Sequence, residues 1–312
     1  MNASPPVSRS RRRLLGGLAA SAALPLSSPA RGAPMAPETR PVPSSGERLP
    51  VVGLGTYRSF DIGTSEAERA PVQEVLRRFV DAGGRVIDSS PMYGRAEATI
   101  GALAGSLGVG ERLFHATKVW TEGREAGIAQ MQRSFARMGV ARMDLMQVHN
   151  LLDVDVHLDT LRGWKADGRV RYIGVTHYHE GAYDALATVL QRDGIDFVQL
   201  NYSIVEREAD RHLLPLAAER GIAVLVNRPF AKGGLFRRVR GQTVPAWAAE
   251  FGADSWARFF LKFILGHPAV TCAIPATGKP AHLDDNMGAG RGPWPDASTR
   301  ERMWRWVEDL PG

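Results

Sequence analysis

Short apolar runs alternate with amphipathic stretches along the chain from about residue 48 onward. Glycine stands at or just past the end of many amphipathic stretches, as it does at the C-terminal ends of helices. This repeated succession of apolar run, amphipathic stretch and glycine predicts parallel βα units. The eight predicted strands cover residues 51–55, 85–88, 114–118, 145–148, 170–175, 197–200, 223–226 and 270–274.

Eight βα units in about 240 residues match the size of a (β/α)₈ TIM barrel, whereas a doubly wound sheet of this length usually has fewer strands. The predicted fold class is therefore α/β, with residues 47–312 forming a single barrel domain. A terminal helix at 297–310 carries Trp304 and Trp306, which we expect to pack rather than to take part in chemistry. The other predicted helices cover residues 72–82, 96–107, 128–138, 158–166, 182–192, 209–219 and 256–265.

The first 33 residues contain five arginines and no acidic residue, and residues 10–15 (Ser-Arg-Arg-Arg-Leu-Leu) match a twin-arginine export motif. An apolar run to about residue 26 follows, which is short for a bilayer span, with Ala30 and Ala33 as cleavage candidates. We predict a signal peptide over 1–33, a linker rich in Pro and Ser over 34–46, and export by the twin-arginine machinery to the periplasm. A basic tail for acidic partners is the alternative, and it leaves the uncharged Leu/Ala stretch unexplained.

The charge of the chain is concentrated in this N-terminal segment. The 312 residues have a formal net charge of +6, and removing the five N-terminal arginines lowers it to +1. The domain therefore lacks the electrostatic footprint of a nucleic-acid-binding protein, and we expect neither a nucleic-acid partner nor a stable membrane anchor. The single cysteine, Cys272, lies in an apolar run, where a buried small side chain is expected rather than a nucleophile.

Four chemically different side chains follow the ends of neighbouring predicted strands. Asp88 ends the second strand, Tyr93 lies in the loop after it, Lys118 ends the third strand and His149 closes the fourth. In a (β/α)₈ barrel the carboxyl ends of the strands form one face, where the chemistry takes place. We therefore expect these four side chains to lie at one rim.

An acid, a phenol, an amine and an imidazole in an apolar mouth suit proton transfer. A tyrosine has a pKa near 10, so it needs help to act as a general acid at neutral pH. A lysine ammonium beside the phenol lowers that pKa, an aspartate orients the lysine, and a histidine donates to an oxygen on which negative charge develops. The set suits reduction of a carbonyl group, with hydride from a cofactor and a proton from Tyr93. Each residue alone also fits a structural role, so their joint position carries the argument.

Three stretches resemble signatures of the aldo/keto reductase family. They are residues 86–97 (Val-Ile-Asp-Ser-Ser-Pro-Met-Tyr-Gly-Arg-Ala-Glu), 117–120 (Thr-Lys-Val-Trp) and 144–149 (Asp-Leu-Met-Gln-Val-His). The resemblance runs from about residue 48 to residue 289, and the motifs are specific because they agree in order and spacing. It implies a (β/α)₈ barrel that binds NADPH extended across the rim.

The resemblance also implies a role for each residue of the site. Tyr93 would be the acid/base, Lys118 and Asp88 would tune it, and His149 would orient the carbonyl group. Trp120 matches a position that often lines the substrate pocket of the family, and Tyr57 is expected beside it.

A cofactor-binding set follows from the same resemblance. Thr176 and His177 stand where the family usually has Ser-Asn, and the segment 227–235 resembles a Pro-containing loop over the pyrophosphate, where Arg228 and Lys232 offer positive charge. The segment 274–286 resembles the part that grips the adenosine end. The residues assigned to the cofactor are Gly55, Thr56, Thr176, His177, Gln199, Arg228, Pro229, Phe230, Lys279, His282, Asp285 and Asn286.

The sequence indicates where the cofactor binds more clearly than whether the cofactor is NADP(H) or NAD(H). The basic residues that usually contact the 2′-phosphate are replaced by Ala276 and His282, with Lys279 nearby, so NADP(H) is expected and NAD(H) stays open. No strand-linked G-x-G-x-x-G occurs, which argues against a Rossmann site.

The expected function is NAD(P)H-dependent reduction of an aldehyde or ketone to an alcohol, with three alternatives. A metal held by His177 and His179 lacks an obvious third ligand, so no metal is expected. A barrel hydrolase needs paired carboxylates that the sequence does not bring together. A non-catalytic nucleotide-binding redox sensor or subunit of the same fold stays open because an exported enzyme has no evident pool for exchanging its cofactor. The oligomeric state is also open, with a monomer expected from the family.

Overall fold

The computed structural model describes residues 1–4 and 37–310. The chain divides into two units, residues 1–34 and 35–312, and all the helices and strands named below belong to the second unit. The expected signal peptide, with its twin-arginine motif, lies outside the described residues except for its first four positions.

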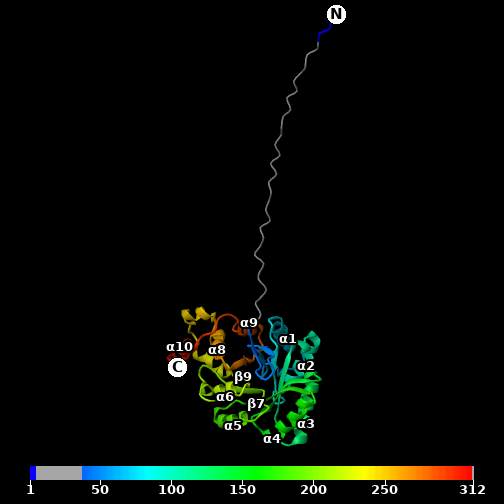
Figure 1. Ribbon diagram of the computed structural model, residues 1–312, viewed down its shortest axis with the longest axis vertical. Coiled ribbons are helices and arrows are strands. Elements are labelled where there is room, and N and C mark those ends of the chain that lie inside the picture. Colours follow the sequence, from blue (N-terminus) through cyan, green and yellow to red (C-terminus); the bar gives the residue numbers. More distant parts are fainter. Residues whose placement is uncertain (5–36, 311–312) are drawn as a thin grey trace. The chain divides into compact units, whose positions relative to one another are not determined.

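Eight parallel strands form one sheet in which each strand pairs with the next along the chain, as the sequence predicted (Figure 1). The first and last strands also meet, because Val52 bridges to Ala273 and Gly55 bridges to Ala276. These bridges close the sheet into a (β/α)₈ barrel. The strands are β3 (Leu54–Gly55), β4 (Val86–Asp88), β5 (Phe114–Val119), β6 (Met143–His149), β7 (Val170–His177), β8 (Phe197–Asn201), β9 (Ala223–Asn227) and β10 (Val270–Ala273).

Two glycines allow the barrel to close. A Cβ atom on Gly53 would lie 2.9 Å from the carbonyl oxygen of Val86, and one on Gly55 would lie 2.7 Å from that of Ile274. A larger residue at either position would push the first strand away from its neighbours.

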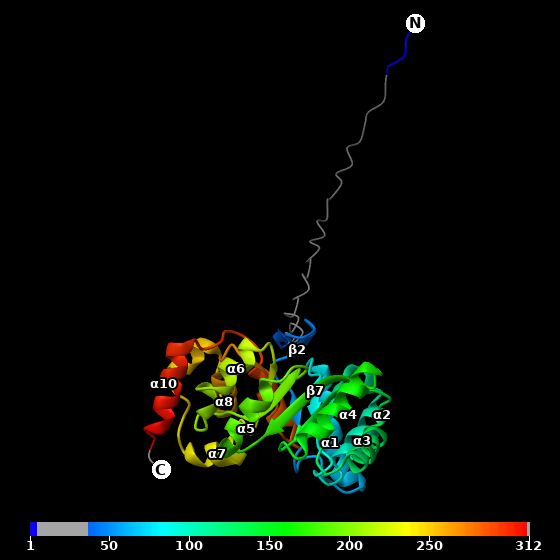
Figure 2. The ribbon, with the colours of Figure 1, turned by 60° about the horizontal axis from the view of Figure 1, so that its bottom comes forward.

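Helices cover the outside of the sheet (Figure 2). The first helix begins at Glu66, before its predicted start at residue 72. Pro71 lies in the second turn of this helix, where it removes a single backbone hydrogen bond but does not end the helix. The short helix in the connection after β9 was not predicted. The helices are α1 (Glu66–Asp81), α2 (Ala96–Leu107), α3 (Arg124–Met138), α4 (Val154–Ala166), α5 (Tyr183–Leu190), α6 (Leu213–Glu219), α7 (Gly234–Arg238), α8 (Trp256–Leu265), α9 (Pro280–Gly288) and α10 (Ala297–Glu308).

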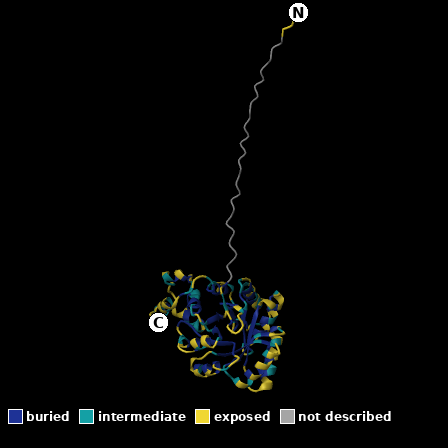
Figure 3. Cartoon of the chain, in the orientation of Figure 1, coloured by how far each residue is buried: buried dark blue, intermediate teal, exposed yellow. Residues whose placement is uncertain are grey.

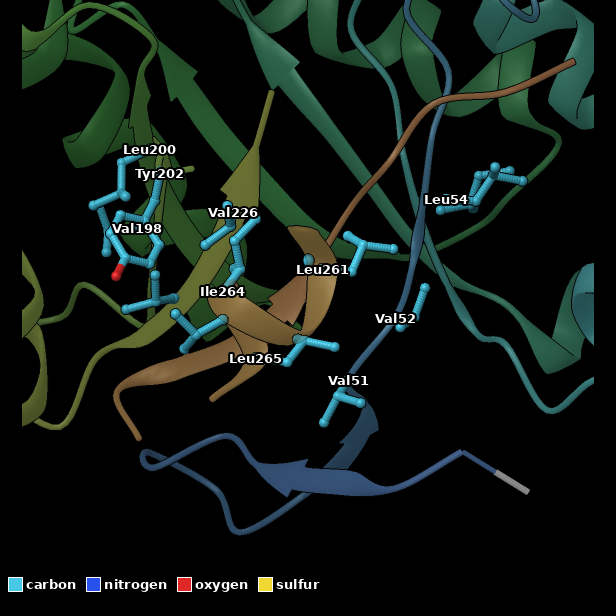
Figure 4. Packing of buried hydrophobic residues seen from close by; sticks show 14 of the residues in the cluster. Val51, Val52, Leu54, Val198, Leu200, Tyr202, Val226, Leu261, Ile264 and Leu265 are labelled. Atoms are coloured by element: carbon cyan, nitrogen blue, oxygen red, sulfur yellow. The ribbon is translucent and has the colours of Figure 1, made fainter. Parts of the chain in front are cut away.

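The core has an outer and an inner layer. In the outer layer, Leu261, Ile264 and Leu265 of α8 belong to the same buried cluster as Val198 and Val226 on the strands (Figure 4). Buried residues follow the strands, while the exposed ones lie mainly on the helices and loops (Figure 3). The expected packing role of Trp306 agrees with its ring lying 5.4 Å from that of Trp256.

The inner layer fills the barrel itself. Phe114, Tyr172 and Phe197 project from the first half of their strands, and their ring centroids lie 5.4–6.0 Å apart. A hairpin of β1 (Thr39–Pro41) and β2 (Arg48–Pro50) adds Val42 and Leu49, both fully buried, to this cluster. The hairpin therefore plugs the N-terminal end of the barrel. The described part of the expected linker, residues 37–46, is thus part of the domain, because this open end needs an apolar cover.

In the part of the chain that the structure describes, no helix has the length and the apolar character that a membrane crossing requires.

Candidate active site

The periodicity of the strands directs a set of polar side chains into the barrel mouth. Residues two apart on a strand share a face. Asp88 stands two positions after the interior residue Val86, and Lys118 four positions after the interior residue Phe114. The same spacing holds for four other buried polar residues near the carboxyl ends of the strands, which are Gln147, His149, Thr176 and Gln199.

Lys118 and Asp88 form a buried ion pair. The ammonium of Lys118 is fully buried and donates to Asp88 Oδ2 at 2.7 Å and to the carbonyl oxygen of Ser89 at 2.6 Å. The other carboxylate oxygen, Oδ1, accepts from the side-chain amides of Gln147 at 3.0 Å and Gln199 at 2.9 Å. Burial lowers the pKa of Lys118, while the negative charge of Asp88 opposes that shift.

Tyr93 lies in the loop after β4, with its ring centroid 5.3 Å from Lys118 Nζ. The sequence led us to expect a lowered pKa for this phenol, and that expectation is wrong for the protein alone. Burial raises the pKa of Tyr93 above its usual value, and the charge of Asp88 adds to the effect. The ammonium of Lys118 is paired with Asp88, so its positive charge does not outweigh burial and the negative charge of Asp88. The phenol therefore keeps its proton at neutral pH and is available as a donor.

His149 is the last residue of β6, and its Nδ1 atom contacts the hydroxyl of Ser90. Ser90 Oγ lies 3.2 Å from His149 Nδ1 and also accepts the backbone N–H of Met92 at 3.5 Å. When the hydroxyl proton points to Nδ1, the imidazole carries its own proton on Nε2. Burial, with the nearby charge of Lys118, lowers the pKa of His149 to about 3, so the ring is neutral over the physiological range.

Sequence reasoning missed Ser90 and Gln147. Gln147 was detectable because it lies two positions before His149 on the same strand, and therefore on the same face. Gly174 on the neighbouring strand makes room for it, since a Cβ there would lie 2.9 Å from Gln147 Cγ. Ser90 gave no sequence signal beyond its position in the loop between Asp88 and Tyr93.

Two expected substrate-pocket residues stand at the rim beside these groups. The ring of Tyr57 lies 5.0 Å from that of Tyr93, with the planes at 62°. The ring of Trp120 lies 6.1 Å from that of His149. Both side chains are exposed, so the mouth next to Tyr93 has aromatic walls.

Some residues assigned to the cofactor hold the strand ends together. Thr56 donates its hydroxyl to the carbonyl oxygen of Asp88 at 2.9 Å. Thr176 donates to Gln199 Oε1 at 3.2 Å, while the amide nitrogen of Gln199 bonds Asp88. Gly55 is a barrel-closing residue of β3.

His177 and its neighbour His179 form local turns. His177 Nδ1 accepts the N–H of His179 at 3.1 Å, and His179 Nδ1 accepts the N–H of Gly181 at 3.0 Å. Within residues 37–310, no group of three or more His, Cys, Asp or Glu side chains is placed to hold a metal ion.

The loop after β9 contains Arg228, Pro229 and Phe230. Arg228 has a left-handed backbone (φ 50°), donates to the carbonyl oxygen of Tyr178 at 2.8 Å and pairs with Glu206 at 3.4 Å. Pro229 is buried, and the ring of Phe230 lies 4.9 Å from that of Phe236 on α7.

The β10 connection leads into α9. Lys279 precedes this helix and, like His282, is exposed. Asp285 accepts the hydroxyl of Ser255 at 2.7 Å and lies 3.0 Å from Arg258, while Asn286 is buried. The carboxylate of Asp285 is therefore already partly satisfied by protein groups.

Comparison with known proteins agrees with the fold. The family model described as "Aldo/keto reductase family" matches residues 51–301. An aldo-keto reductase of Mycobacterium sp. (strain JLS) is 26% identical over 254 residues, covering 78% of this chain and 84% of the relative. Methylglyoxal reductase YeaE of Escherichia coli is 25% identical over 76% of this chain and 84% of its own length.

A solved structure has the same architecture. An aldo-keto reductase from Klebsiella pneumoniae, crystallised in complex with NADPH, superposes with a TM-score of 0.72 at 23% identity, covering 88% of this chain and 96% of the other. Since the family model spans most of the barrel, the chain belongs to the aldo/keto reductase family.

Proposed function

We propose that this protein reduces an aldehyde or ketone to an alcohol with NAD(P)H, and that Tyr93 supplies the proton. The observation that carries the proposal is the buried Lys118–Asp88 ion pair, which lies below a protonated phenol and next to a neutral imidazole. Membership in a family that generally reduces carbonyl groups with NAD(P)H supports the same reaction class.

Each residue has a defined part in the reaction. His149, with a proton on Nε2, donates a hydrogen bond to the carbonyl oxygen and so orients it. Tyr93 transfers its proton to that oxygen as negative charge develops there. Lys118 lies near the phenol and stabilises the phenolate that remains, and Asp88 keeps Lys118 in place through the 2.7 Å contact. When bound, the reduced nicotinamide supplies the hydride.

The groups around the mouth fit a nicotinamide nucleotide. Among the described residues, the buried oxygens Asn150 Oδ1 and Asn227 Oδ1 have no hydrogen-bond partner, and each can accept from an amide N–H₂. The N-terminus of α9 has no side-chain cap, and its first-turn N–H groups attract phosphate. Exposed Lys232 and Lys279 add positive charge beside these loops.

We assign the nucleotide to the twelve positions named from the family resemblance, with NADP(H) as the expected cofactor and NAD(H) as the alternative. The NADPH complex of the Klebsiella pneumoniae relative supports this choice. The internal bonds of Gln199 and Thr176 give these two residues a second role, which is to fix Asp88.

We also propose that the protein is exported to the periplasm by the twin-arginine route. The support is in the sequence alone, in the motif at residues 10–15 and the apolar run after it. Its partners would be the export machinery and a small carbonyl compound, with the domain acting as a monomer.

The test is a titration of residues 34–312 with NADPH and, separately, with NADH, followed by cofactor fluorescence and then by consumption of reduced cofactor with a carbonyl panel. Micromolar binding and turnover are expected. Comparable affinity for both nucleotides would move the cofactor assignment to dual specificity. Binding without any turnover would favour a nucleotide sensor, and binding of neither nucleotide would overturn the proposal.

A further inference from the structure

The loop between β3 and α1 lies against the loop that carries Tyr93. Thr56 begins the first of these loops and donates both its backbone N–H and its hydroxyl to the carbonyl oxygen of Asp88, at 3.2 and 2.9 Å. Four residues later, Phe60 is fully buried, and its backbone N–H bonds the carbonyl oxygen of Thr56 at 3.1 Å. Asp61, the next residue, is therefore held at a fixed place beside the carboxyl end of β4.

Asp61 binds the backbone of the Tyr93 loop. Its Oδ1 atom accepts the backbone N–H of Arg95, the N-cap residue of α2, at 2.9 Å. This helix begins without a side-chain cap of its own. The carboxylate of Asp61 therefore supplies an acceptor from another loop at the N-terminus of α2, where the helix dipole favours a negative charge.

Gly94 allows this close approach. Its backbone is left-handed (φ 58°), and a Cβ atom there would lie 2.3 Å from Asp61 Oδ1. Glycine adopts this conformation without strain, and the missing Cβ leaves room for the carboxylate. The residue directly after Tyr93 is thus suited to the contact between Asp61 and Arg95.

The bond to Asp61 ties the Tyr93 loop to a distant part of the chain. The backbone N–H of Tyr93 bonds the carbonyl oxygen of Ser90 at 3.0 Å, which is a contact inside the loop itself. Among the described residues, the bond from Arg95 N–H to Asp61 is the one hydrogen bond that links residues 91–95 to a segment outside this loop and α2. The position of the Tyr93 backbone therefore depends on Asp61.

We propose that Asp61 is a positioning residue for the reduction: through the N–H of Arg95, its carboxylate fixes the loop so that the Tyr93 hydroxyl meets the substrate oxygen. This inference rests on the proposed function. A reacting group that is displaced by about 1 Å can lose ~10²-fold in rate. The Tyr93 ring also lies 5.0 Å from the ring of Tyr57 and 5.3 Å from Lys118 Nζ, so the loss of the Asp61 contact displaces it only in part.

The test compares Asp61→Ala with Asp61→Asn in the full chain, because the amide oxygen of asparagine can still accept the N–H of Arg95. The substrates are methylglyoxal and benzaldehyde, at saturating NADPH. We expect the single-turnover rate to fall about 10-fold in Asp61→Ala and to stay within about 2-fold of the wild type in Asp61→Asn. The Kd for NADPH should not change in either variant, because Asp61 acts on the proton donor.

Glu68→Ala is the matched control. Glu68 Oε1 accepts the backbone N–H of Gly63 at 3.1 Å, so this variant removes a carboxylate from the same loop without touching the Tyr93 segment. Its single-turnover rate should equal that of the wild type. A loss as large as that of Asp61→Ala would mean that the rate follows the general order of the loop, and the positioning role would be wrong.

A second readout follows Tyr93 itself and needs no turnover. The chain has six tyrosines, so ring-labelled tyrosine gives a simple carbon NMR spectrum in which Tyr93→Phe identifies the Tyr93 signal. That signal should shift in Asp61→Ala and keep its wild-type position in Asp61→Asn and in Glu68→Ala.

The outcomes separate this inference from the proposed function. If the wild type reduces neither aldehyde with either nucleotide, the proposed function fails and the role of Asp61 in it fails as well. If the wild type is active but Asp61→Ala keeps its rate, or Asp61→Asn loses as much as Asp61→Ala, the reductase assignment stands and Asp61 is not a positioning residue. An unshifted Tyr93 signal in Asp61→Ala would lead to the same conclusion.

Discussion

The ammonium of Lys118 and the carboxylate of Asp88 are 2.7 Å apart in a place that water does not reach. Taking two charges out of water costs free energy that their attraction offsets only when every remaining hydrogen bond is satisfied. Here Gln147 and Gln199 donate to the second oxygen of Asp88, and the carbonyl oxygen of Ser89 accepts another hydrogen bond from Lys118. Such an ion pair contributes little to the stability of the fold, but it holds a charge at a fixed position near the Tyr93 phenol.

Replacing Tyr93 with Phe should remove the proton donor and leave the fold intact. The Tyr93 hydroxyl has no hydrogen-bond partner among the described residues, so the substitution breaks no internal bond. We expect kcat to fall by about 10²- to 10⁴-fold, the usual contribution of a positioned acid. Steady-state kinetics measure the loss, and cofactor titration and thermal unfolding should match the wild type. Activity within a few-fold of the wild type would rule out Tyr93 as the acid.

Replacing Ser90 with Ala should allow the imidazole proton of His149 to occupy either ring nitrogen. When Ser90 Oγ donates across its 3.2 Å contact to His149 Nδ1, the imidazole carries its proton on Nε2, where it can reach a substrate oxygen. We expect kcat to fall roughly 10-fold with little change in cofactor affinity. Nitrogen NMR of the labelled imidazole reads the tautomer directly. An unchanged tautomer with unchanged kcat would show that Ser90 only fills space.

The barrel was predictable from the sequence because each strand is an apolar run followed by a helix that often ends at glycine. Asp88, Lys118 and His149 were predictable as rim residues because the fold places all strand ends on one face. The hairpin was not predicted, since its strands have three residues each and their burial depends on the distant Phe114 and Tyr172. The local sequence pattern of the hairpin carries no information about contacts with residues so distant in the chain.

The hydrogen-bond partners inside the site were also beyond the sequence. Gln199 was assigned to a cofactor contact, but the structure shows both ends of its amide bonded to protein, to Asp88 and Thr176. The raised pKa of Tyr93 likewise comes mainly from burial and then from the charge of Asp88, and both depend on the packing of the folded site. Residue types suggest a mechanism, whereas the distances decide which group carries the charge.

The neutral state of His149 should make the stability of the fold depend on pH. Unfolded histidine takes up a proton near pH 6.5, whereas the pKa of folded His149 is lowered to about 3, mainly by burial. Between these values the unfolded state binds more protons, so the free energy of unfolding decreases as the pH falls through this window. His149→Gln should remove up to about 1.4 kcal/mol of this loss per pH unit.

Urea unfolding at pH 6, 5 and 4 measures this slope. His212 is exposed, so His212→Gln is the matched control and should keep the pH dependence of the wild type. If His149→Gln and the wild type lose stability in parallel, the imidazole of His149 is charged in the fold and its assigned role as a neutral donor is wrong.

The ion pair of Arg228 and Glu206 should compete with the cofactor. Both terminal nitrogens of Arg228 face protein oxygens, at Tyr178 and Glu206, while Arg228 Nε and Glu206 Oε2 are buried without a partner among the described residues. A pair with unsatisfied atoms and a left-handed backbone at Arg228 is costly to keep. A cofactor phosphate that binds the guanidinium of Arg228 therefore displaces only a weak contact with Glu206.

Glu206→Gln should free Arg228 for that phosphate. We expect the Kd for NADPH to fall about 2- to 5-fold, the range of a partly exposed ion pair, with a steeper dependence on salt. Arg228→Gln should weaken binding, and in the double variant the effect of Glu206→Gln should vanish, because the carboxylate then has no cation to withhold. Fluorescence titration at two salt concentrations measures all four proteins. Weaker binding in Glu206→Gln alone would mean instead that Glu206 orients Arg228 toward the phosphate.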